Sequence, residues 1–232
     1  MTAPAALPRI LFRDSRFVVL DKPAGLPVHA GPSGGASVED WFPALSRRKD
    51  GPWLVHRLDA DTAGCLVIAL RRAALLAAQC EFASGRARKT YWAVARGRPQ
   101  GASGVVDAPL LRRSAPDGWR IVIDPAGQRA VTAWQMLGHG DGLSWLALRP
   151  RTGRTHQVRV HCAALGCPIL GDERYGGGPG GLHLLSRAIE LMLDPPVSAV
   201  AEPPAAMLGA LRRCGFTGTG TPALMGAAGG AP

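Results

Sequence analysis

The sequence contains no asparagine, 2 tyrosines and only 3 lysines among its 27 basic residues. The other 24 basic residues are arginines, and they accompany abundant alanine, glycine and proline. A GC-rich genome produces this bias without any binding role, so the number of arginines alone is weak support for a ligand. The net charge of +10 nevertheless favours a polyanionic partner, either nucleic acid or an anionic membrane surface.

A long hydrophobic run is also missing. The clean run of strongly apolar residues at 64–70 is far short of the roughly 20 residues that a membrane-spanning helix needs. The N-terminal segment 1–14 has neither the basic region nor the hydrophobic stretch of a secretory signal. Five cysteines at irregular positions are typical of reduced thiols and not of a disulfide framework. We therefore expect a cytoplasmic protein that does not bind membranes.

The 232 residues are enough for one large domain with its own hydrophobic core. Apolar runs predict strands at 9–13, 17–22, 64–70, 89–95, 119–123, 130–137, 143–148 and, as the final strand, 183–191. Helices are predicted at 37–45, 72–84 and 155–165. Because the strands do not alternate regularly with helices, we expect an α+β fold with a mixed, mostly antiparallel sheet and a few flanking helices.

Three segments are expected along the chain. Residues 1–8 form a short N-terminal extension, and residues 9–213 form the folded domain. Residues 214–232 are rich in Gly, Ala, Pro and Thr, a composition typical of a flexible tail.

A polar segment, LVHRLDADTAG at 54–64, comes directly before the predicted buried strand. Side chains at the end of such a strand are held firmly, and functional groups are often placed there. Asp59 in this segment is suited to act as a nucleophile or a general base. A plain turn that caps the strand explains the same pattern, so both interpretations stay open at this point.

Two arginine-rich segments are candidates for binding an anion. In RTGRTHQVRVH at 151–161, a glycine turn leads into a helix whose N-terminus carries Arg154, which suits a phosphate. In SGRARKTYWAVARGR at 84–98, five basic residues surround Tyr91 and Trp92, a mixture typical of nucleic-acid binding. Adjacent strand residues point to opposite faces, so we expect Tyr91 to meet a ligand and Trp92 to pack in the sheet. A solvated basic helix face remains the alternative for the first segment.

Metal and nucleotide motifs do not fit the sequence. The spacing of Cys162 and Cys167 within one short helix does not match a zinc knuckle, even with His156 and His161 nearby. The glycines at 176–181 match neither a Walker loop nor a dinucleotide fingerprint.

The motifs together resemble the RluA-type family of RNA pseudouridine synthases. The matching segments are DKPAG at 21–25, HRLDADTAG at 56–64, KTY at 89–91, TGRTHQVRVH at 152–161 continuing to LGD at 170–172, and Tyr175–Gly176. They occur in the family order and cover about residues 9–195. The resemblance implies the pseudouridine synthase fold with a central RNA cleft in a catalytic domain at 9–213, working without cofactor or metal. The absence of a heptad repeat or a large amphipathic seam favours a monomer.

The resemblance also implies roles for individual residues. Asp59 matches the essential aspartate, Arg159 the arginine that pairs with it, and Tyr91 the tyrosine that stacks on the target base. Arg57 matches the arginine that fills the gap left by the flipped nucleotide. The remaining expected RNA contacts are His56, Arg154, Thr155, His156, Gln157, Arg86, Arg88 and Lys89. The substrate would be a uridine in tRNA or rRNA. Asp59 could either attack the sugar or remove its 2′ proton, and both routes stay open.

Some positions depart from the family pattern. The usual Thr-Ser-Gly is Thr-Ala-Gly at 62–64, and the region 183–195 differs from the family near its end, which leaves the choice of RNA open. No S4-type RNA-binding domain is expected before residue 9. Two other functions compete with a synthase: a catalytically silent RNA-binding module of the same fold, and a DNA-binding or structural protein. The presence of Asp59, Tyr91 and Arg159, together with the clustering of basic residues, favours the synthase.

Overall fold

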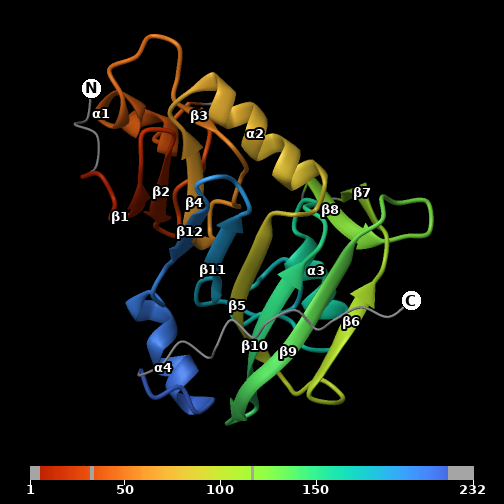
Figure 1. Cartoon of the computed structure of the whole chain (residues 1–232). Coiled ribbons are helices and arrows are strands. Elements are labelled where there is room, and N and C mark those ends of the chain that lie inside the picture. The colour runs from red at the N-terminus through yellow and green to blue at the C-terminus, as the bar shows by residue number, and fades with distance from the viewer. Residues whose placement is uncertain (1–5, 32–33, 116–117, 219–232) are drawn as a thin grey trace.

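The computed structural model describes residues 6–31, 34–115 and 118–218. Most of the strands form one ten-stranded sheet, whose main strand order is β1-β2-β4-β11-β5-β10-β9-β6 (Figure 1). Two further strands pair outside this order, β3 with β4 and β12 with β11. The strands of this sheet are β1 (Ile10–Arg13), β2 (Phe17–Lys22), β3 (Trp53–Leu54), β4 (Ala63–Ala69), β5 (Arg88–Arg96), β6 (Ser103–Asp107), β9 (Val131–Gly140), β10 (Leu143–Pro150), β11 (Leu184–Leu191) and β12 (Val197–Val200). The pairing of β4 with β11 is parallel and the other pairings are antiparallel. The predicted mixed, mostly antiparallel sheet is therefore confirmed.

A separate hairpin lies outside this sheet. It consists of β7 (Leu110–Ala115) and β8 (Gly118–Ile123), which pair only with each other as a two-stranded sheet among the described residues. The hairpin reaches the first turn of α3 (Gln157–Ala164) through Trp119, whose ring stacks on the His156 imidazole at 5.2 Å.

Helices cover both faces of the main sheet. Helices α2 (Arg72–Ala83) and α4 (Ala205–Arg213) pack into one core cluster, on the face nearer the viewer in Figure 1. The 3₁₀ helix η1 (Val38–Trp41) with α1 (Phe42–Leu45) packs into a second cluster, and α3 packs into a third. Tyr91 borders both the second and the third cluster, so it marks the line between them.

Strand β4 is the centre of the core, because all seven of its residues are buried. Its side chains alternate between faces, as a strand requires: Cys65 and Val67 belong to the α2 and α4 cluster, whereas Leu66 and Ile68 belong to the cluster of η1 and α1. The sequence prediction of a strand buried on both faces is confirmed.

The C-terminal part corrects the sequence prediction. The strand at 183–191 is not the final one, because β12 pairs with β11 and α4 follows. The predicted tail boundary at 214 also falls too early: Cys214 is 2% exposed, and the Phe216 ring packs against Trp92 and Trp145. The rest of the predicted tail, from 219 to 232, and residues 1–5 of the predicted extension lie outside the described residues.

Two further differences are local. The predicted helix at 37–45 is a 3₁₀ turn followed by one short α-helix. The 3₁₀ turn starts where the Asp40 carboxylate accepts a hydrogen bond from the Ser37 N–H at 2.9 Å. Strands β3, β6 and β7 were not predicted from the sequence. Among the described residues, no helix has both the length and the apolar character needed to cross a membrane.

Candidate active site

A pocket opens along the line between the second and third core clusters. Apart from Leu184 of β11, its lining comes from three places: the turn before β4 with Asp59, the start of β5 with Lys89 and Tyr91, and the segment from Pro150 to Arg159 that leads into α3. These are the same three segments that the sequence motifs single out, so the fold brings distant motifs into one site.

Asp59 is held in the turn that precedes β4. Its carbonyl accepts a hydrogen bond from the Thr62 N–H at 3.1 Å, and Thr62 is buried. The turn is fixed further by Lys22, whose ammonium group donates to the carbonyls of Pro23, Leu26 and Ala60 at 2.7–2.8 Å. An ammonium group has three protons to donate, so these three bonds use all of them.

Lys22 is fully buried, which is unusual for a lysine. Burial lowers its pKa to about 8, while the charges of Asp61 and Asp59 act in the opposite direction. The lysine therefore joins the loop after β2 to the turn that carries Asp59. The DKPAG segment supports the site in this way, although none of its residues lines the pocket.

The carboxylate of Asp59 faces the guanidinium of Arg159. Its Oδ2 lies 3.5 Å from Arg159 Nη1, and its side chain is 21% exposed. Arg159 itself is bound by Asp172, with Nε donating to Oδ2 and Nη2 to Oδ1, each at 2.8 Å. This bidentate contact with a fully buried carboxylate fixes the direction of the guanidinium. The guanidinium also lies over the Tyr175 ring, with its carbon 5.2 Å from the ring centroid.

His156 approaches the same carboxylate from another side, with Nε2 at 3.7 Å from Asp59 Oδ2. Its Nδ1 lies 2.8 Å from the Tyr175 hydroxyl, which accepts a hydrogen bond from the Ile121 N–H at 3.2 Å. In the neutral tautomer that carries its proton on Nε2, the Tyr175 hydroxyl donates to Nδ1 and the ring proton faces Asp59. Burial lowers the pKa of His156, which favours the neutral ring.

The backbone of His156 is unusual as well. It adopts the left-handed conformation, with φ of 53°, immediately before α3. Non-glycine residues rarely adopt this conformation, and they often do so at functional sites. The ring is held between Trp119, stacked at 5.2 Å, and Tyr175, edge-on at 5.6 Å.

Tyr91 and Trp92 point to opposite sides of β5. Tyr91 lines the pocket, and burial raises its pKa. Trp92 is 3% exposed and packs edge-on against Trp145 at 4.7 Å, so the expected packing role of Trp92 is confirmed.

The basic residues expected to contact RNA divide into two groups. Arg57, Lys89 and Arg154 line the pocket, and burial lowers the pKa of Lys89 to about 8. Arg86 and Arg88 do not line it: Arg86 forms an ion pair with Glu81 at 2.7 Å, and Arg88 lies 3.8 Å from Glu190. The run of positive charge in the sequence is therefore partly neutralised by acids from other segments.

His56, also expected to contact RNA, is placed in the protein interior instead. Its Nε2 accepts a hydrogen bond from the Val67 N–H at 3.0 Å, and its ring stacks on Phe82 at 5.1 Å. Burial lowers its pKa to about 3, so the ring is an uncharged packing and hydrogen-bonding group between β4 and α2.

Thr155 and Gln157 line the pocket, but Gln157 is 3% exposed and acts as a brace. Its amide oxygen accepts from the Arg154 N–H at 3.0 Å and from the Thr152 hydroxyl at 2.6 Å, while its amide nitrogen donates to Val131. The segment before α3 is thereby fastened to β9.

The residues weighed as zinc ligands do not converge. His161 Nδ1 lies 2.9 Å from the Thr132 hydroxyl, and Cys162 is buried in a core cluster. Within the described part of the chain, no group of three or more His, Cys, Asp or Glu side chains is arranged to hold a metal ion.

Four residues of the site had no role assigned from the sequence: Lys22, Trp119, Asp172 and Tyr175. Lys22, Asp172 and Tyr175 lie within the matching motifs, and this position is the one sequence signal that could have found them. Trp119 has no such signal, because its contact with His156 depends on how the hairpin folds back.

The sequence model of a family described as RNA pseudouridylate synthase matches residues 16–164. The chain belongs to this family. Membership confirms the resemblance drawn from the motifs and makes the protein an isomerase of the RNA pseudouridine synthase type.

Individual relatives agree with this family. An uncharacterized RNA pseudouridine synthase of Zymomonas mobilis subsp. mobilis is 42% identical over 212 residues, covering 88% of this synthase and 97% of the relative. The ribosomal large subunit pseudouridine synthase C of Haemophilus ducreyi is 37% identical over 72% of this chain. This chain spans 52% of that protein and 65% of a 36% identical relative from Synechocystis.

Solved structures show the same fold. The synthase superposes on human RNA pseudouridylate synthase domain containing 4 with a TM-score of 0.74 and 30% identity, covering 88% of this chain and 92% of the human one. The human domain containing 1 gives a TM-score of 0.72 with 28% identity, over 92% and 90% of the two chains. The expected pseudouridine synthase fold is therefore confirmed.

Proposed function

We propose that this synthase converts specific uridines of structured RNA, in tRNA or rRNA, to pseudouridine, with Asp59 as the catalytic carboxylate. The observation that carries the proposal is the placement of this partly buried carboxylate opposite Arg159 and His156 in a pocket that Tyr91 also lines. The name of the Haemophilus relative refers to the ribosomal large subunit, which supports rRNA as one candidate substrate.

The reaction requires the target uridine to leave its base stack, at a cost of a few kcal/mol. Arg57, Lys89 and Arg154 offer positive charge to the flanking phosphates at the rim of the pocket. Arg57 is exposed and beside the pocket, a place suited to filling the gap that the flipped nucleotide leaves. Tyr91 supplies a ring on which the extruded base can stack.

Asp59 then acts on the sugar of the flipped nucleotide. Arg159 and the Nε2 proton of His156 favour the ionised carboxylate and set its direction. The N1–C1′ bond breaks, the base rotates and a bond forms between C5 and C1′. The proton on C5 is released and N1 takes up a proton, so atoms balance without an added reactant. Attack on the sugar carbon and removal of the 2′ proton both suit an oriented carboxylate.

The synthase needs no cofactor in this proposal and acts as a monomer in the cytoplasm. Each step uses a side chain of this one chain, which supports a monomer. His56, Arg86 and Arg88 are left out of the proposed RNA surface, because their side chains are engaged elsewhere.

Tritium release from RNA labelled at uridine C5 tests the proposal, because formation of the C5–C1′ bond frees that label. We expect release from either tRNA or rRNA transcripts by the wild type and none by Asp59→Ala. The matched control is Asp61→Ala, two residues away in the same turn and not part of the pocket lining. Tight RNA binding without release from any transcript would favour the silent RNA-binding module.

A further inference from the structure

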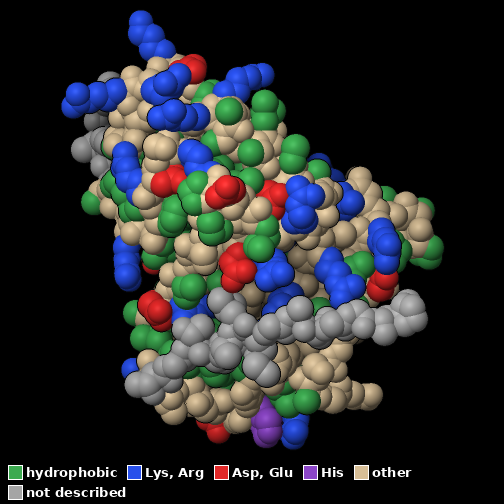
Figure 2. Space-filling model, viewed as in Figure 1, with side chains coloured by type: hydrophobic (Ala, Val, Ile, Leu, Met, Phe, Trp, Pro, Cys, Tyr) green, Lys and Arg blue, Asp and Glu red, His purple; other side chains and the backbone are tan. Residues whose placement is uncertain are grey.

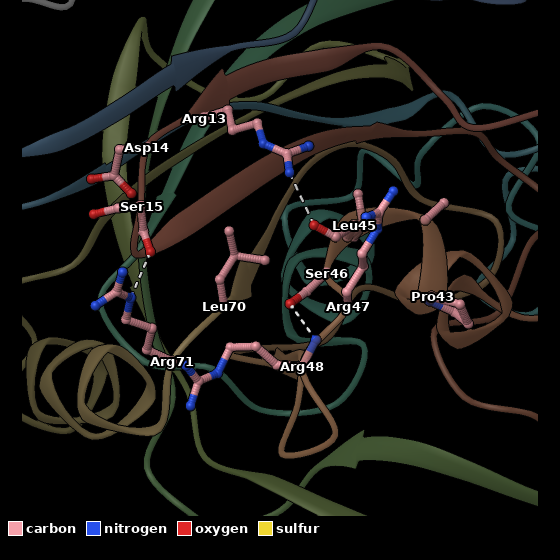
Figure 3. A pocket seen from close by; sticks show the side chains of 11 residues that line it. Arg13, Asp14, Ser15, Pro43, Leu45, Ser46, Arg47, Arg48, Leu70 and Arg71 are labelled. Atoms are coloured by element: carbon pink, nitrogen blue, oxygen red, sulfur yellow. Dashed lines mark hydrogen bonds between the residues drawn. The ribbon is translucent and has the colours of Figure 1, made fainter.

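A second pocket lies at the other end of β4, away from Asp59. It is formed by the turn between β1 and β2, the end of α1 with the loop after it, and the junction of β4 with α2. Figure 3 shows Leu70 in its middle, with Arg13 on one side and Arg71 and Arg48 on the other. Its lining contains four arginines, Arg13, Arg47, Arg48 and Arg71, and a single acid, Asp14.

The acidic partners of this pocket do not neutralise it. Asp14 accepts hydrogen bonds from the side chain and the backbone N–H of Arg16, at 3.0 and 2.7 Å. Arg48 is paired with Asp50 at 3.0 Å. Arg13, Arg47 and Arg71 form no ion pair among the described residues, so three guanidinium charges remain uncompensated around one hollow.

Two of these guanidinium groups are held in place by neutral groups. Arg13 donates to the Leu45 carbonyl at 3.0 Å, and Arg71 donates to the Ser15 carbonyl at 3.0 Å (Figure 3). Each guanidinium has five N–H donors, so both keep most of them for a ligand. The Ser46 hydroxyl oxygen accepts the Arg48 N–H, which leaves its own proton as a further donor. Oriented donors that carry an excess of positive charge over the single carboxylate of Asp14 fit a phosphate.

The two pockets share one face of the protein. The second core cluster contains Leu58, which lines the active-site pocket, and also Leu45 and Leu70, which line the arginine pocket. Strand β4 separates them: from Thr62 to Leu70, at about 3.3 Å per residue, the span is about 25 Å. Figure 2 shows Lys and Arg side chains gathered at the end of the molecule that carries α1 and the loop after it.

We propose that this arginine pocket binds a backbone phosphate of the same RNA, several nucleotides away from the uridine in the active site. The proposal rests on the proposed function for the nature of the ligand. A synthase with this second contact selects RNAs whose backbone spans both pockets, in addition to the sequence around the target uridine.

The test measures the salt dependence of binding of unmodified tRNA transcripts in the Asp59→Ala background, where no turnover occurs. Each lost phosphate contact lowers the slope of log K against log salt by about 0.7 to 0.9. We expect Arg47→Gln/Arg71→Gln to lower the slope by about 0.7 to 0.9, the value for one phosphate, so the loss of affinity between 50 and 200 mM salt shrinks about threefold. The matched control is Arg212→Gln/Arg213→Gln, which removes two exposed charges from α4.

An unchanged slope in the pocket variant, or an equal decrease in the α4 variant, would overturn the proposal. Oligouridylates of increasing length give a second measurement. The affinity of the wild type should rise with length until both pockets are bridged, whereas that of the pocket variant should level off earlier; identical length profiles would also overturn it. Neither assay depends on isomerisation, so failure of the pocket and failure of the proposed activity are separate results.

Discussion

Arg159 is bound to Asp172 through two hydrogen bonds of 2.8 Å, whereas its distance to Asp59 is 3.5 Å. The fully buried carboxylate of Asp172 therefore fixes the guanidinium, and the guanidinium orients the more exposed carboxylate of Asp59. Asp172 acts as a positioning residue through this arrangement, without contact to RNA in the proposed mechanism.

Asp172→Asn tests this relationship. The amide offers one acceptor instead of two and places donors against the guanidinium, so Arg159 should turn away from Asp59. A displacement of about 1 Å costs about 100-fold in rate, and we expect that decrease in the single-turnover rate with RNA affinity within about twofold. Glu173→Gln, an exposed neighbour, is the control. Equal losses of rate and affinity would contradict a positioning role.

Tyr91 should contribute its ring more than its hydroxyl. Stacking on a base is worth about 1–3 kcal/mol, so Tyr91→Ala should weaken RNA binding by roughly 5- to 150-fold. Tyr91→Phe keeps the ring and should bind within about threefold of the wild type. Fluorescence titration of labelled RNA measures both variants, and equal affinities of the two would rule out stacking.

Lys89 makes RNA affinity dependent on pH. Burial lowers its pKa to about 8, so the lysine is charged below that value and loses its charge as the pH rises through it. Affinity should therefore decrease above about pH 8, with the midpoint moved upward when a phosphate is bound. Lys89→Arg stays charged and should remove this decrease. If the wild type and Lys89→Arg show the same dependence of RNA affinity on pH, the decrease above pH 8 is due to another group.

Gly64 is required by the contact between β4 and β11. Its φ is 104°, and a Cβ atom would lie 2.3 Å from the Ser186 carbonyl oxygen of β11. Gly64→Ala should therefore lower the free energy of unfolding by about 3 kcal/mol or more, which thermal unfolding would report as a decrease in Tm of roughly 6–12 °C. Gly209→Ala in α4, where nothing lies within 4 Å, should slightly raise the Tm. A Gly64→Ala variant as stable as the wild type would contradict this packing.

The parts of the fold that were predicted from the sequence have strong local signals. The continuous apolar run of β4 and the Ala/Leu-rich helix α2 are examples. Helix α4 was missed because it lies in a Pro- and Ala-rich segment, and its burial depends on contacts of Met207 and Leu211 with distant strands. The parallel pairing of β4 with β11 likewise depends on residues more than a hundred positions apart.

The site shows the same division between local and distant information. The motifs predicted that Asp59, Tyr91 and Arg159 belong to one site, and the structure places all three around one pocket. The motifs do not predict the direction of each side chain. His56 lies three residues before Asp59, yet its ring accepts a hydrogen bond from the Val67 N–H of β4 and does not line the pocket. Glu81 and Glu190 neutralise part of the arginine run, and the run itself gives no sign of them.

The hairpin of β7 and β8 holds the His156 and Tyr175 pair through Trp119 and the Ile121 N–H, yet its strands share no ladder with the main sheet. A change in hairpin length beyond these two residues shifts no register in β9 or β10. The length of the hairpin and the geometry of the reacting groups are therefore independent of each other, as long as the contacts of Trp119 and Ile121 are kept.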